Sequence, residues 1–380
     1  MSTNPLIRLH EYGQSVWYDN IQRAMLHSGE LQRLIADGVR GMTSNPTIFK
    51  NAIAQGQEYQ ADISALRRQG KSPLEIYEAL ALADVGAAAD VFRSLHQESD
   101  GEDGYVSIEV SPRLAHDTQA TITEAQRLFA SLGRPNIMIK VPATPAGLPA
   151  IRDLIGHGVN VNVTLLFSLA VYRQVAEAYL DGLEMLAARG GNLHQVASVA
   201  SFFVSRVDTL ADRLLQARLE AAARSDEKAR LRALQGKLAI ANAKLAYRIF
   251  QEVFDSPRFQ RLKARGARVQ RLLWASTSTK NPAYRDVMYV EELIGPHTVN
   301  TMPPATIEAF KDHGQLRQSL TEKVDEAEAV LAAVHEVGLD MGAITAQLLD
   351  EGVAAFAQSF EELLAAVAAS RPEPVPAAPA

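Results

Sequence analysis

The stretch Asn136–Gly147 reads NIMIKVPATPAG and begins with an apolar run bounded by Pro135 and Pro142. A short run of this kind, rich in β-branched residues, predicts a buried strand rather than a helix. Lys140 lies inside the run, although removing an ammonium group from water costs more free energy than its methylene groups recover. A lysine that loses its charge in an apolar site is a nucleophile for carbonyl carbon. The run by itself also permits a second interpretation, in which Lys140 ends an edge strand and extends its amine to solvent.

The composition is that of an ordinary globular protein. The chain has 380 residues, 47% of them hydrophobic and 22% charged, which is enough for one large domain or two smaller ones. The net charge of −6 provides no basic surface for nucleic acid or an anionic membrane. The absence of cysteine excludes disulfides and thiolate catalysis. No secretory signal and no uncharged apolar run of about 18 residues is found, so we expect a soluble cytoplasmic protein without a membrane span.

Eight short segments have strand-like patterns, and helical patterns separate them. Strands that alternate with helices predict parallel pairing, and eight such units predict an α/β fold of the (β/α)8 (TIM) barrel type with extra helices. A doubly wound sheet is the alternative, but no Gly-x-Gly-x-x-Gly follows the first strand. The predicted strands are Ser15–Asp19, Gly38–Thr43, Tyr105–Val110, Ile137–Val141, Val159–Thr164, Gln195–Ser201, Arg271–Ala275 and His297–Thr301.

The helical regions set the expected domain organisation. Residues 50–100 have helical spacing throughout and predict an insertion of two or three helices. The charged segment Ala221–Arg232 predicts a solvated helical face. We expect residues 1–370 to form a single barrel domain and residues 371–380, RPEPVPAAPA, to form a disordered tail.

Polar and charged residues follow the predicted strands at the end where barrel enzymes carry their reactive groups. Any one of them is more simply a turn residue or a helix cap. One lysine with two carboxylates, hydroxyls and amides at a single rim instead suits imine chemistry on a polyhydroxylated carbonyl compound. The histidines lack metal-ligand spacing, so no metal site is expected. The residues at the rim are Asp19, Thr43, Asn45, Glu109, Lys140, Asn162, Thr164, Ser201, Ser276, Thr277 and Thr301.

A possible phosphate site lies beside this rim. Arg206 follows Ser201 by five residues, and together with Ser276 and Lys280 it could bind an anion. Taken alone, Arg206 is more simply an arginine on a helix surface.

Seven segments around these residues resemble transaldolase and span Ser15 to Phe310 in the same strand order. They are SVWYDNI at Asp19, GMTSNPTIFKNAI at Thr43 and Asn45, YVSIEVSPRLAHD at Glu109, NIMIKVPAT at Lys140, NVNVTLLFS at Asn162 and Thr164, ASFFVSRVD at Ser201 and Arg206, and LLWASTSTKNP at Ser276.

The resemblance implies a barrel enzyme that transfers a dihydroxyacetone unit between sugar phosphates in the non-oxidative pentose phosphate pathway, without metal or organic cofactor. It implies that Lys140 forms an imine with the ketose phosphate, that Asp19 moves the proton in carbon–carbon cleavage, and that Glu109 with Thr164 positions a water. Thr43, Asn45 and Asn162 are implied in binding the dihydroxyacetone part, and Ser201 and Arg206 in binding phosphate.

Two departures limit the resemblance: the motif at the seventh strand differs, and the segment between the second and third strands and the region after Ala305 are longer than in compact family members. Many transaldolases have Ala-Ser-Phe-Arg at the seventh strand, whereas this chain has Ala275-Ser276-Thr277-Ser278-Thr279-Lys280, so Lys280 is only a candidate for the second phosphate cation. A fructose 6-phosphate aldolase, which releases free dihydroxyacetone, is the nearest rival. Such aldolases tend to have Gln at the position of Glu109 and Tyr at that of Phe203, so both residues favour transfer. A non-catalytic sugar-phosphate sensor is the rival from another class.

Overall fold

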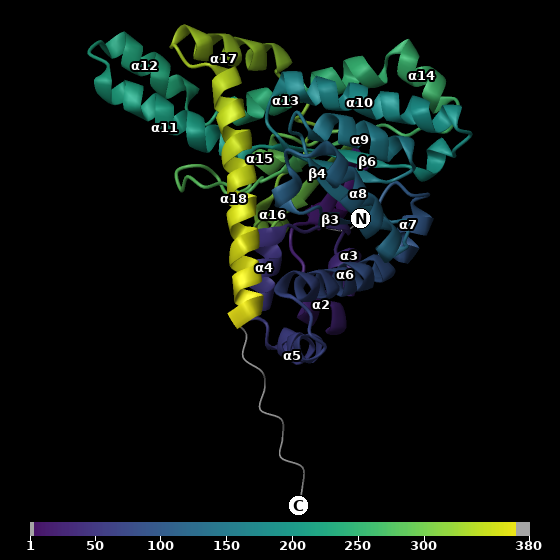
Figure 1. Cartoon of the computed structure of the whole chain (residues 1–380). Coiled ribbons are helices and arrows are strands. Elements are labelled where there is room, and N and C mark those ends of the chain that lie inside the picture. The colour runs from purple at the N-terminus through teal and green to yellow at the C-terminus, as the bar shows by residue number, and fades with distance from the viewer. Residues whose placement is uncertain (1–3, 370–380) are drawn as a thin grey trace, which may run out of the picture.

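A closed barrel of eight parallel strands, paired with their neighbours in chain order, forms the centre of the computed structural model (Figure 1). The structure describes residues 4–369. This confirms the predicted (β/α)8 class with additional helices. The strands are β1 (Gln14–Tyr18), β2 (Val39–Thr43), β3 (Val106–Glu109), β4 (Ile137–Pro142), β5 (Val161–Leu166), β6 (Ser198–Phe203), β7 (Arg271–Ala275) and β8 (Thr298–Met302).

The strand that contains Lys140 is buried along its whole length. All six residues of β4 are buried, because one face packs inside the barrel and the other packs under the surrounding helices. The parallel register pairs Lys140 with Glu109 on β3 and with Asn162 on β5. Side chains at paired positions of adjacent strands point to the same face. The register therefore places these three polar groups at one level of the barrel.

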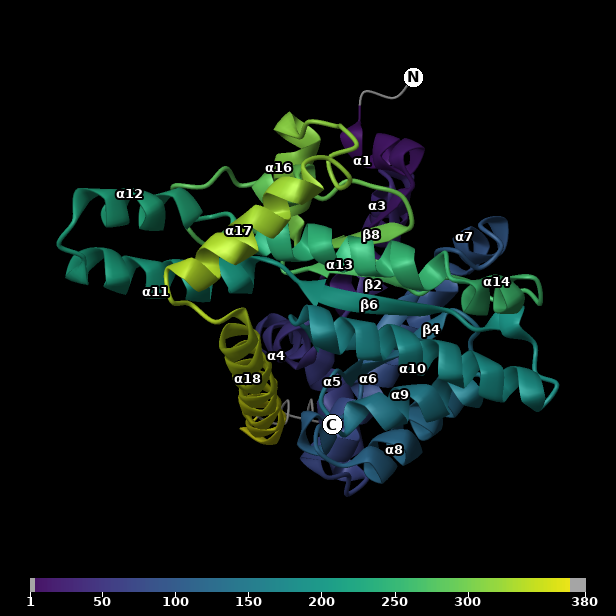
Figure 2. The same ribbon diagram turned by 90° about the horizontal axis from the view of Figure 1, so that it is seen from above.

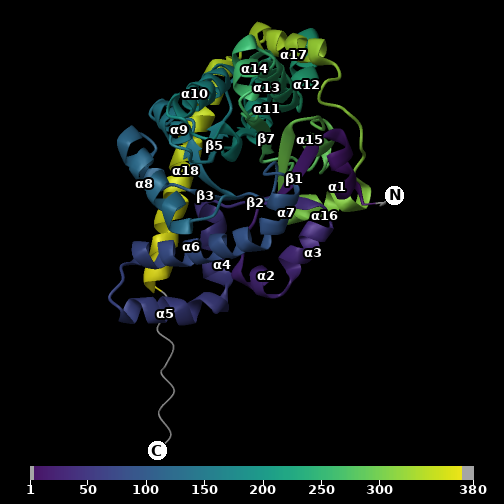
Figure 3. The same cartoon turned by 90° about the vertical axis from the view of Figure 1, so that its right-hand side faces the viewer.

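The helices form an outer layer around the strands, as Figure 3 shows. Helices α11 and α12 project from this layer beside α17 (Figures 1 and 2). The helices are α1 (Pro5–Arg8), α2 (Arg23–His27), α3 (Glu30–Ala36), α4 (Pro46–Gln55), α5 (Gln60–Arg68), α6 (Pro73–Val91), α7 (Arg93–Glu98), α8 (Thr118–Leu132), α9 (Gly147–Gly156), α10 (Leu169–Ala188), α11 (Ser205–Ala221), α12 (Ser225–Leu234), α13 (Leu238–Phe254), α14 (Pro257–Lys263), α15 (Met288–Glu291), α16 (Pro304–His313), α17 (Val324–Glu336) and α18 (Met341–Ala369).

Three local expectations need correction. Strand β6 begins at Ser198 rather than Gln195, because Leu193–Gln195 forms a 3₁₀ turn (η4). The predicted insertion at residues 50–100 contains parts of four helices rather than two or three. The breaks fall around Gly56, at the turn before the capping box of α6, and at Phe92. Strand β5 runs from Val161 to Leu166 rather than from Val159 to Thr164. Before β1 the chain forms α1 and a 3₁₀ helix (η1, Leu9–Tyr12), and Leu6 and Leu9 are buried in the core.

The prediction that Ala221–Arg232 forms a solvated helical face is confirmed, and the prediction of a disordered tail stays a prediction. Helix α12 carries most of the charges of Ala221–Arg232, and they are exposed, as expected of a solvated face. The predicted disordered tail, residues 371–380, lies outside the described residues.

Helix α18 is the one helix in residues 4–369 that is long and apolar enough to cross a membrane, judged by length and composition alone. Its buried residues recur every three or four positions and form one stripe, which includes Gly352, Phe356 and Phe360. The stripe packs on α4, α6, α11 and β5. Glu361 and Glu362, away from the stripe, pair with basic residues of the 3₁₀ turn η3 (Pro112–Leu114) and of α4. This packing accounts for the apolar residues of the buried stripe of α18.

A network of charges fills the barrel at the amino-terminal ends of the strands. Asp103 accepts hydrogen bonds from Arg40 at 2.6 Å, from Ser15 at 2.9 Å and from Arg271 at 3.1 Å. We call these four residues the floor cluster. Burial alone raises the pKa of Asp103, but Arg271 and Arg40 together hold it below its ordinary value.

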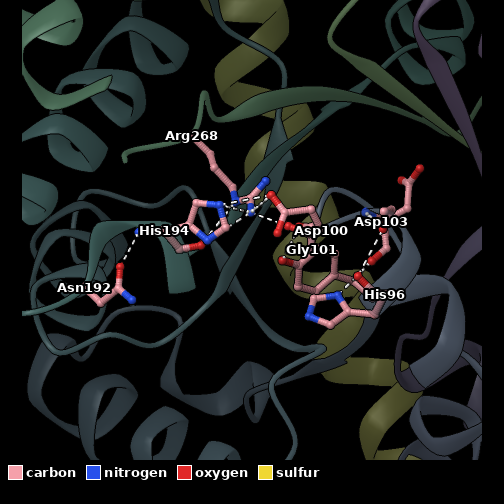
Figure 4. Close-up of polar contacts among 9 residues, drawn as sticks. His96, Asp100, Gly101, Asp103, Asn192, His194 and Arg268 are labelled. Atoms are coloured by element: carbon pink, nitrogen blue, oxygen red, sulfur yellow. Dashed lines mark hydrogen bonds and ion pairs between the residues drawn. The ribbon is translucent and has the colours of Figure 1, made fainter. Parts of the chain in front are cut away.

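A more exposed set of contacts lies beside the floor cluster. His194 and Arg268 both point to Asp100, as Figure 4 shows; His194 Nε2 lies 3.1 Å from Asp100 Oδ2. In the same view His96 contacts the carbonyl oxygen of Asp103 at 2.9 Å. These contacts join the loop before β3 to the segments before β6 and β7. They thereby hold Asp103, which lies in that loop, in position at the end of the barrel.

Candidate active site

A cavity of about 180 Å³ lies at the carboxyl-terminal ends of the strands. Most of the residues predicted from the sequence line it, although they come from seven different strand ends. Three residues predicted at the rim, Glu109, Asn162 and Thr277, are not part of this lining. The predicted residues in the lining are Asp19, Thr43, Asn45, Lys140, Thr164, Ser201, Phe203, Arg206, Ser276, Lys280 and Thr301.

Lys140 is 5% exposed, and its amine lies between polar groups of two neighbouring strands. Nζ donates a hydrogen bond to the carbonyl oxygen of Ser44 at 3.0 Å and lies 3.4 Å from Glu109 Oε2. The amine is therefore held inside the barrel mouth and does not extend to solvent from an edge strand. This geometry removes the second interpretation of the apolar run, since a closed barrel has no edge strand.

Glu109 and Thr164 leave hydrogen-bonding capacity unused beside the lysine. They lie on β3 and β5, the two strands that flank β4. Glu109 Oε2 and Thr164 Oγ1 are buried and have no hydrogen-bond partner within the described residues. Such groups in a native protein usually mark a water or a ligand. Burial raises the pKa of Glu109, and the nearby Lys140 only partly opposes this effect.

Asp19 follows β1 and is held by a hydroxyl from β2. Thr43 Oγ1 donates to Asp19 Oδ1 at 2.7 Å and lies 2.7 Å from the hydroxyl of Thr301 on β8. Burial raises the pKa of Asp19, while Lys140 and the Thr43 hydrogen bond favour the charged form. A carboxyl group balanced in this way can take up and return a proton. We call Lys140, Glu109 and Asp19 the rim cluster.

Asn45 and Asn162 have roles that the sequence did not separate. Asn45 caps α4: its Oδ1 accepts the backbone N–H of Ile48 at 2.9 Å, which leaves its amide nitrogen for a ligand. Asn162 is fully buried behind the cavity wall. Its Oδ1 accepts from Ser201 at 2.7 Å and its amide donates to Ser107 at 3.0 Å. Asn162 therefore fixes Ser201 rather than lining the cavity itself.

Cationic side chains gather at the side of the cavity formed by the ends of β6 and β7. The Arg206 guanidinium lies 5.2 Å from the centre of the Phe203 ring, and burial lowers the pKa of Arg206. Ser276 has a left-handed backbone (φ 57°), and its hydroxyl lies 3.0 Å from that of Ser205. Strained backbone of this kind is concentrated at functional sites. Lys280 lies in the same lining, where it donates to Ser278 at 2.8 Å.

The lining also contains Phe356 of α18, which sequence reasoning missed. Its ring centre lies 6.0 Å from Lys140 Nζ. Helix α18 can approach the barrel closely because Gly352 faces Leu165: a Cβ at Gly352 would lie 2.8 Å from Leu165 Cδ2. The four-residue spacing of Gly352, Phe356 and Phe360 indicated a buried helix face. It did not indicate which part of the barrel that face covers.

Within residues 4–369, no group of three or more histidine, aspartate or glutamate side chains is arranged to hold a metal ion. The chemistry available to the cavity from these residues is that of an amine, two carboxyl groups, hydroxyls and two cations.

Comparison with known proteins relates this arrangement to one family. The family described as Transaldolase/Fructose-6-phosphate aldolase matches residues 16–367. The chain is 47% identical to the transaldolase of Trichodesmium erythraeum over 367 residues, which is 96% of this chain and 97% of that protein. It is 49% identical to transaldolase 1 of Streptomyces coelicolor, covering 96% and 94% of the two chains, and 48% identical to the transaldolase of Thiobacillus denitrificans, covering 93% and 97%.

Proposed function

The chain belongs to the transaldolase/fructose-6-phosphate aldolase family, and we propose that it transfers a dihydroxyacetone unit from a ketose phosphate to an aldose phosphate through an imine at Lys140. Full-length similarity to proteins named transaldolase supports the transferase activity. The observation that carries the assignment to Lys140 is its position: it is buried in the cavity wall, with Glu109 at 3.4 Å and Asp19 in the same lining.

Imine formation uses Lys140 and the two groups beside it. The amine of Lys140 attacks the C2 carbonyl carbon of fructose 6-phosphate or sedoheptulose 7-phosphate. The carbonyl oxygen leaves as water with one hydrogen from the amine and one proton from Glu109, which leaves a protonated imine. Glu109 moves the protons of this step, and it holds the water with Thr164. Both groups have unused hydrogen-bonding capacity next to Lys140.

Asp19 performs the proton transfer that breaks the carbon–carbon bond. It takes the proton of the C4 hydroxyl, the C3–C4 bond breaks, and the electron pair of that bond moves toward the protonated imine nitrogen to form a neutral enamine. An aldose phosphate leaves, and the dihydroxyacetone unit remains on Lys140. The acceptor aldose phosphate, glyceraldehyde 3-phosphate or erythrose 4-phosphate, then adds by the reverse steps, and water releases the new ketose. The raised pKa of Asp19 suits a group that takes up and returns a proton.

The sugar phosphate is held at both ends. The amide of Asn45 and the Thr43 hydroxyl contact the dihydroxyacetone part, and Asn162 acts indirectly by orienting Ser201. Arg206 with Ser276 binds the phosphate, and Lys280 supplies a second cation at that end of the cavity. Phe203 packs on Arg206 and fixes its position.

We also place the protein in the cytoplasm, where sugar phosphates are its substrates, and we take residues 1–370 as one catalytic domain. Neither nucleic acid nor a membrane is proposed as a partner, since the chain has a net charge of −6.

Reduction with borohydride in the presence of fructose 6-phosphate tests this function. We expect a stable mass adduct on the peptide that contains Lys140, and no adduct there would refute the imine mechanism. Steady-state assays with and without an acceptor distinguish transfer from release. Cleavage of fructose 6-phosphate at full rate without an acceptor would show a fructose 6-phosphate aldolase, and binding without turnover would show a sensor.

A further inference from the structure

A second cavity of about 260 Å³ lies on the far side of Glu109 from the substrate cavity. It is enclosed by α6, α8, the 3₁₀ turn η3 (Pro112–Leu114) and Phe360 of α18. Its wall includes Leu74, which is 43% exposed, and the surface ion pair between Arg127 and Glu78. The second cavity therefore extends from the protein surface to the rim cluster.

The Glu109 side chain forms the partition between the two cavities. It lines the second cavity, is 6% exposed, and contacts Lys140, which lines the substrate cavity. Its Oε2 atom has no hydrogen-bond partner within residues 4–369. A buried carboxylate oxygen with an unused acceptor, next to a cavity large enough for several waters, is a site for ordered water.

Tyr77 of α6 stands in the second cavity together with Glu109. Its ring is held edge-on between Phe49, at a centroid distance of 5.8 Å, and Phe360, at 5.5 Å. No hydrogen bond joins its hydroxyl to any other group in the described part of the chain. Burial raises the pKa of Tyr77, and Glu109 contributes more than any other charge to this rise. The hydroxyl is thus free to hold a water that also contacts Glu109.

We propose that the second cavity is the path by which water enters and leaves the imine site, with Tyr77 as a positioning residue for the water bound to Glu109. The proposal rests on the imine mechanism at Lys140. Each turnover releases one water when the imine forms and consumes one when it is hydrolysed. While a sugar phosphate fills the cavity of about 180 Å³, a path behind Glu109 lets that water pass without displacing the substrate.

The test separates the step that needs water from the step that does not. The wild-type enzyme and Tyr77→Phe are first converted to the dihydroxyacetone imine with fructose 6-phosphate and then mixed with glyceraldehyde 3-phosphate. Carbon–carbon bond formation consumes the aldehyde without water, whereas release of free ketose phosphate requires hydrolysis. We expect release to slow by about tenfold in Tyr77→Phe, and aldehyde consumption to stay within about twofold of wild type.

Two further variants complete the experiment. Ala81→Leu, which fills the second cavity from α6, should slow release in the same way. Tyr247→Phe removes a tyrosine hydroxyl on α13 and should change neither step. Release at the wild-type rate in both Tyr77→Phe and Ala81→Leu would overturn the water path, as would equal slowing of both steps. If no imine forms on Lys140 in the wild type, the proposed function itself fails, and that result is visible before any variant is made.

Discussion

Two charged clusters are buried at opposite ends of the same barrel, and they are built in opposite ways. In the floor cluster, one carboxylate receives two arginines and a serine, and the pKa of Asp103 falls. In the rim cluster, two carboxyl groups share one lysine, and the pKa values of Asp19 and Glu109 rise. The floor cluster uses its charges to hold strands together. The rim cluster has one cation for two carboxyl groups, and Glu109 Oε2 has no hydrogen-bond partner within the described residues. These two features allow its carboxyl groups to take up and release protons.

The largest effect should come from Lys140→Met. The substitution removes the only proposed nucleophile while keeping a side chain of similar length, so kcat should fall by about 10⁴-fold or more. Unfolding in urea should show a folded protein. The matched control is Lys244→Met, because Lys244 is also buried but donates to the carbonyl oxygens of Ser319 and Glu322. That control should lose stability and keep the imine adduct, and measurable turnover by Lys140→Met would contradict the assignment.

The next largest effect is expected on the free energy of unfolding, from a substitution in the floor cluster. Asp103→Asn removes the negative charge that compensates two arginines, so the free energy of unfolding should fall by about 3 kcal/mol. Urea unfolding measures this change, and the variant should still form the borohydride adduct at Lys140. Asp100→Asn is the control: Asp100 has a side chain that is 79% exposed, and the change should stay within about 0.5 kcal/mol. Equal losses in the two variants would remove the contrast between the clusters.

The lowered pKa of Asp103 also sets the sign of its pH dependence. Its contribution to stability is present above the ordinary aspartate pKa of about 3.9 and is lost as the pH falls through the lower folded-state pKa. Wild type should therefore lose more stability than Asp103→Asn between about pH 4 and pH 2. Parallel curves for the two proteins would contradict this.

In the rim cluster, the pH dependence of stability has the opposite sign. Because the pKa of Glu109 is raised, its ionisation opposes folding at neutral pH, so Glu109→Gln should be more stable than wild type at pH 7. The difference should fade as the pH falls through the raised folded-state pKa towards the ordinary glutamate value of about 4.3. Turnover should fall by about 10²-fold, because the glutamine cannot accept a proton. Urea unfolding at several pH values and a kcat measurement check both effects, and a less stable variant at pH 7 would contradict the prediction.

The smallest effect should come from Phe356→Leu. The leucine keeps the cavity apolar but loses the ring face near Lys140, so kcat/KM should fall by about fivefold. Val367→Ala is the control, since it loosens the same buried stripe of α18 further from the cavity. It should lower stability by about 1 kcal/mol without changing kcat/KM. If both variants lower kcat/KM equally, Phe356 acts only by holding α18 in place.

The chemistry could be predicted from the sequence because a barrel brings the ends of all its strands together at one rim, however far apart they are in the chain. Once eight strands were recognised, the residues after them had to meet at one rim, and the resemblance supplied their roles. The sequence did not show which neighbouring groups each of these residues contacts. Asn162 was expected in the substrate site, but its hydrogen bonds to Ser201 and Ser107 hold it behind the wall. Asn45 stays a predicted substrate-binding residue, and only the structure shows that its amide oxygen also caps α4.

The sequence by itself determined the alternation of strands and helices and the set of side chains at the strand ends, because these depend on local pattern and order. Only the tertiary structure decided that Phe356 covers Lys140 and that a second cavity reaches Glu109. Both depend on how α6 and α18 pack on the barrel, and such packing joins residues far apart in the chain, where periodicity indicates a buried face but not its partner. The apolar run around Lys140 indicated a strand; closure of the barrel made it part of a site.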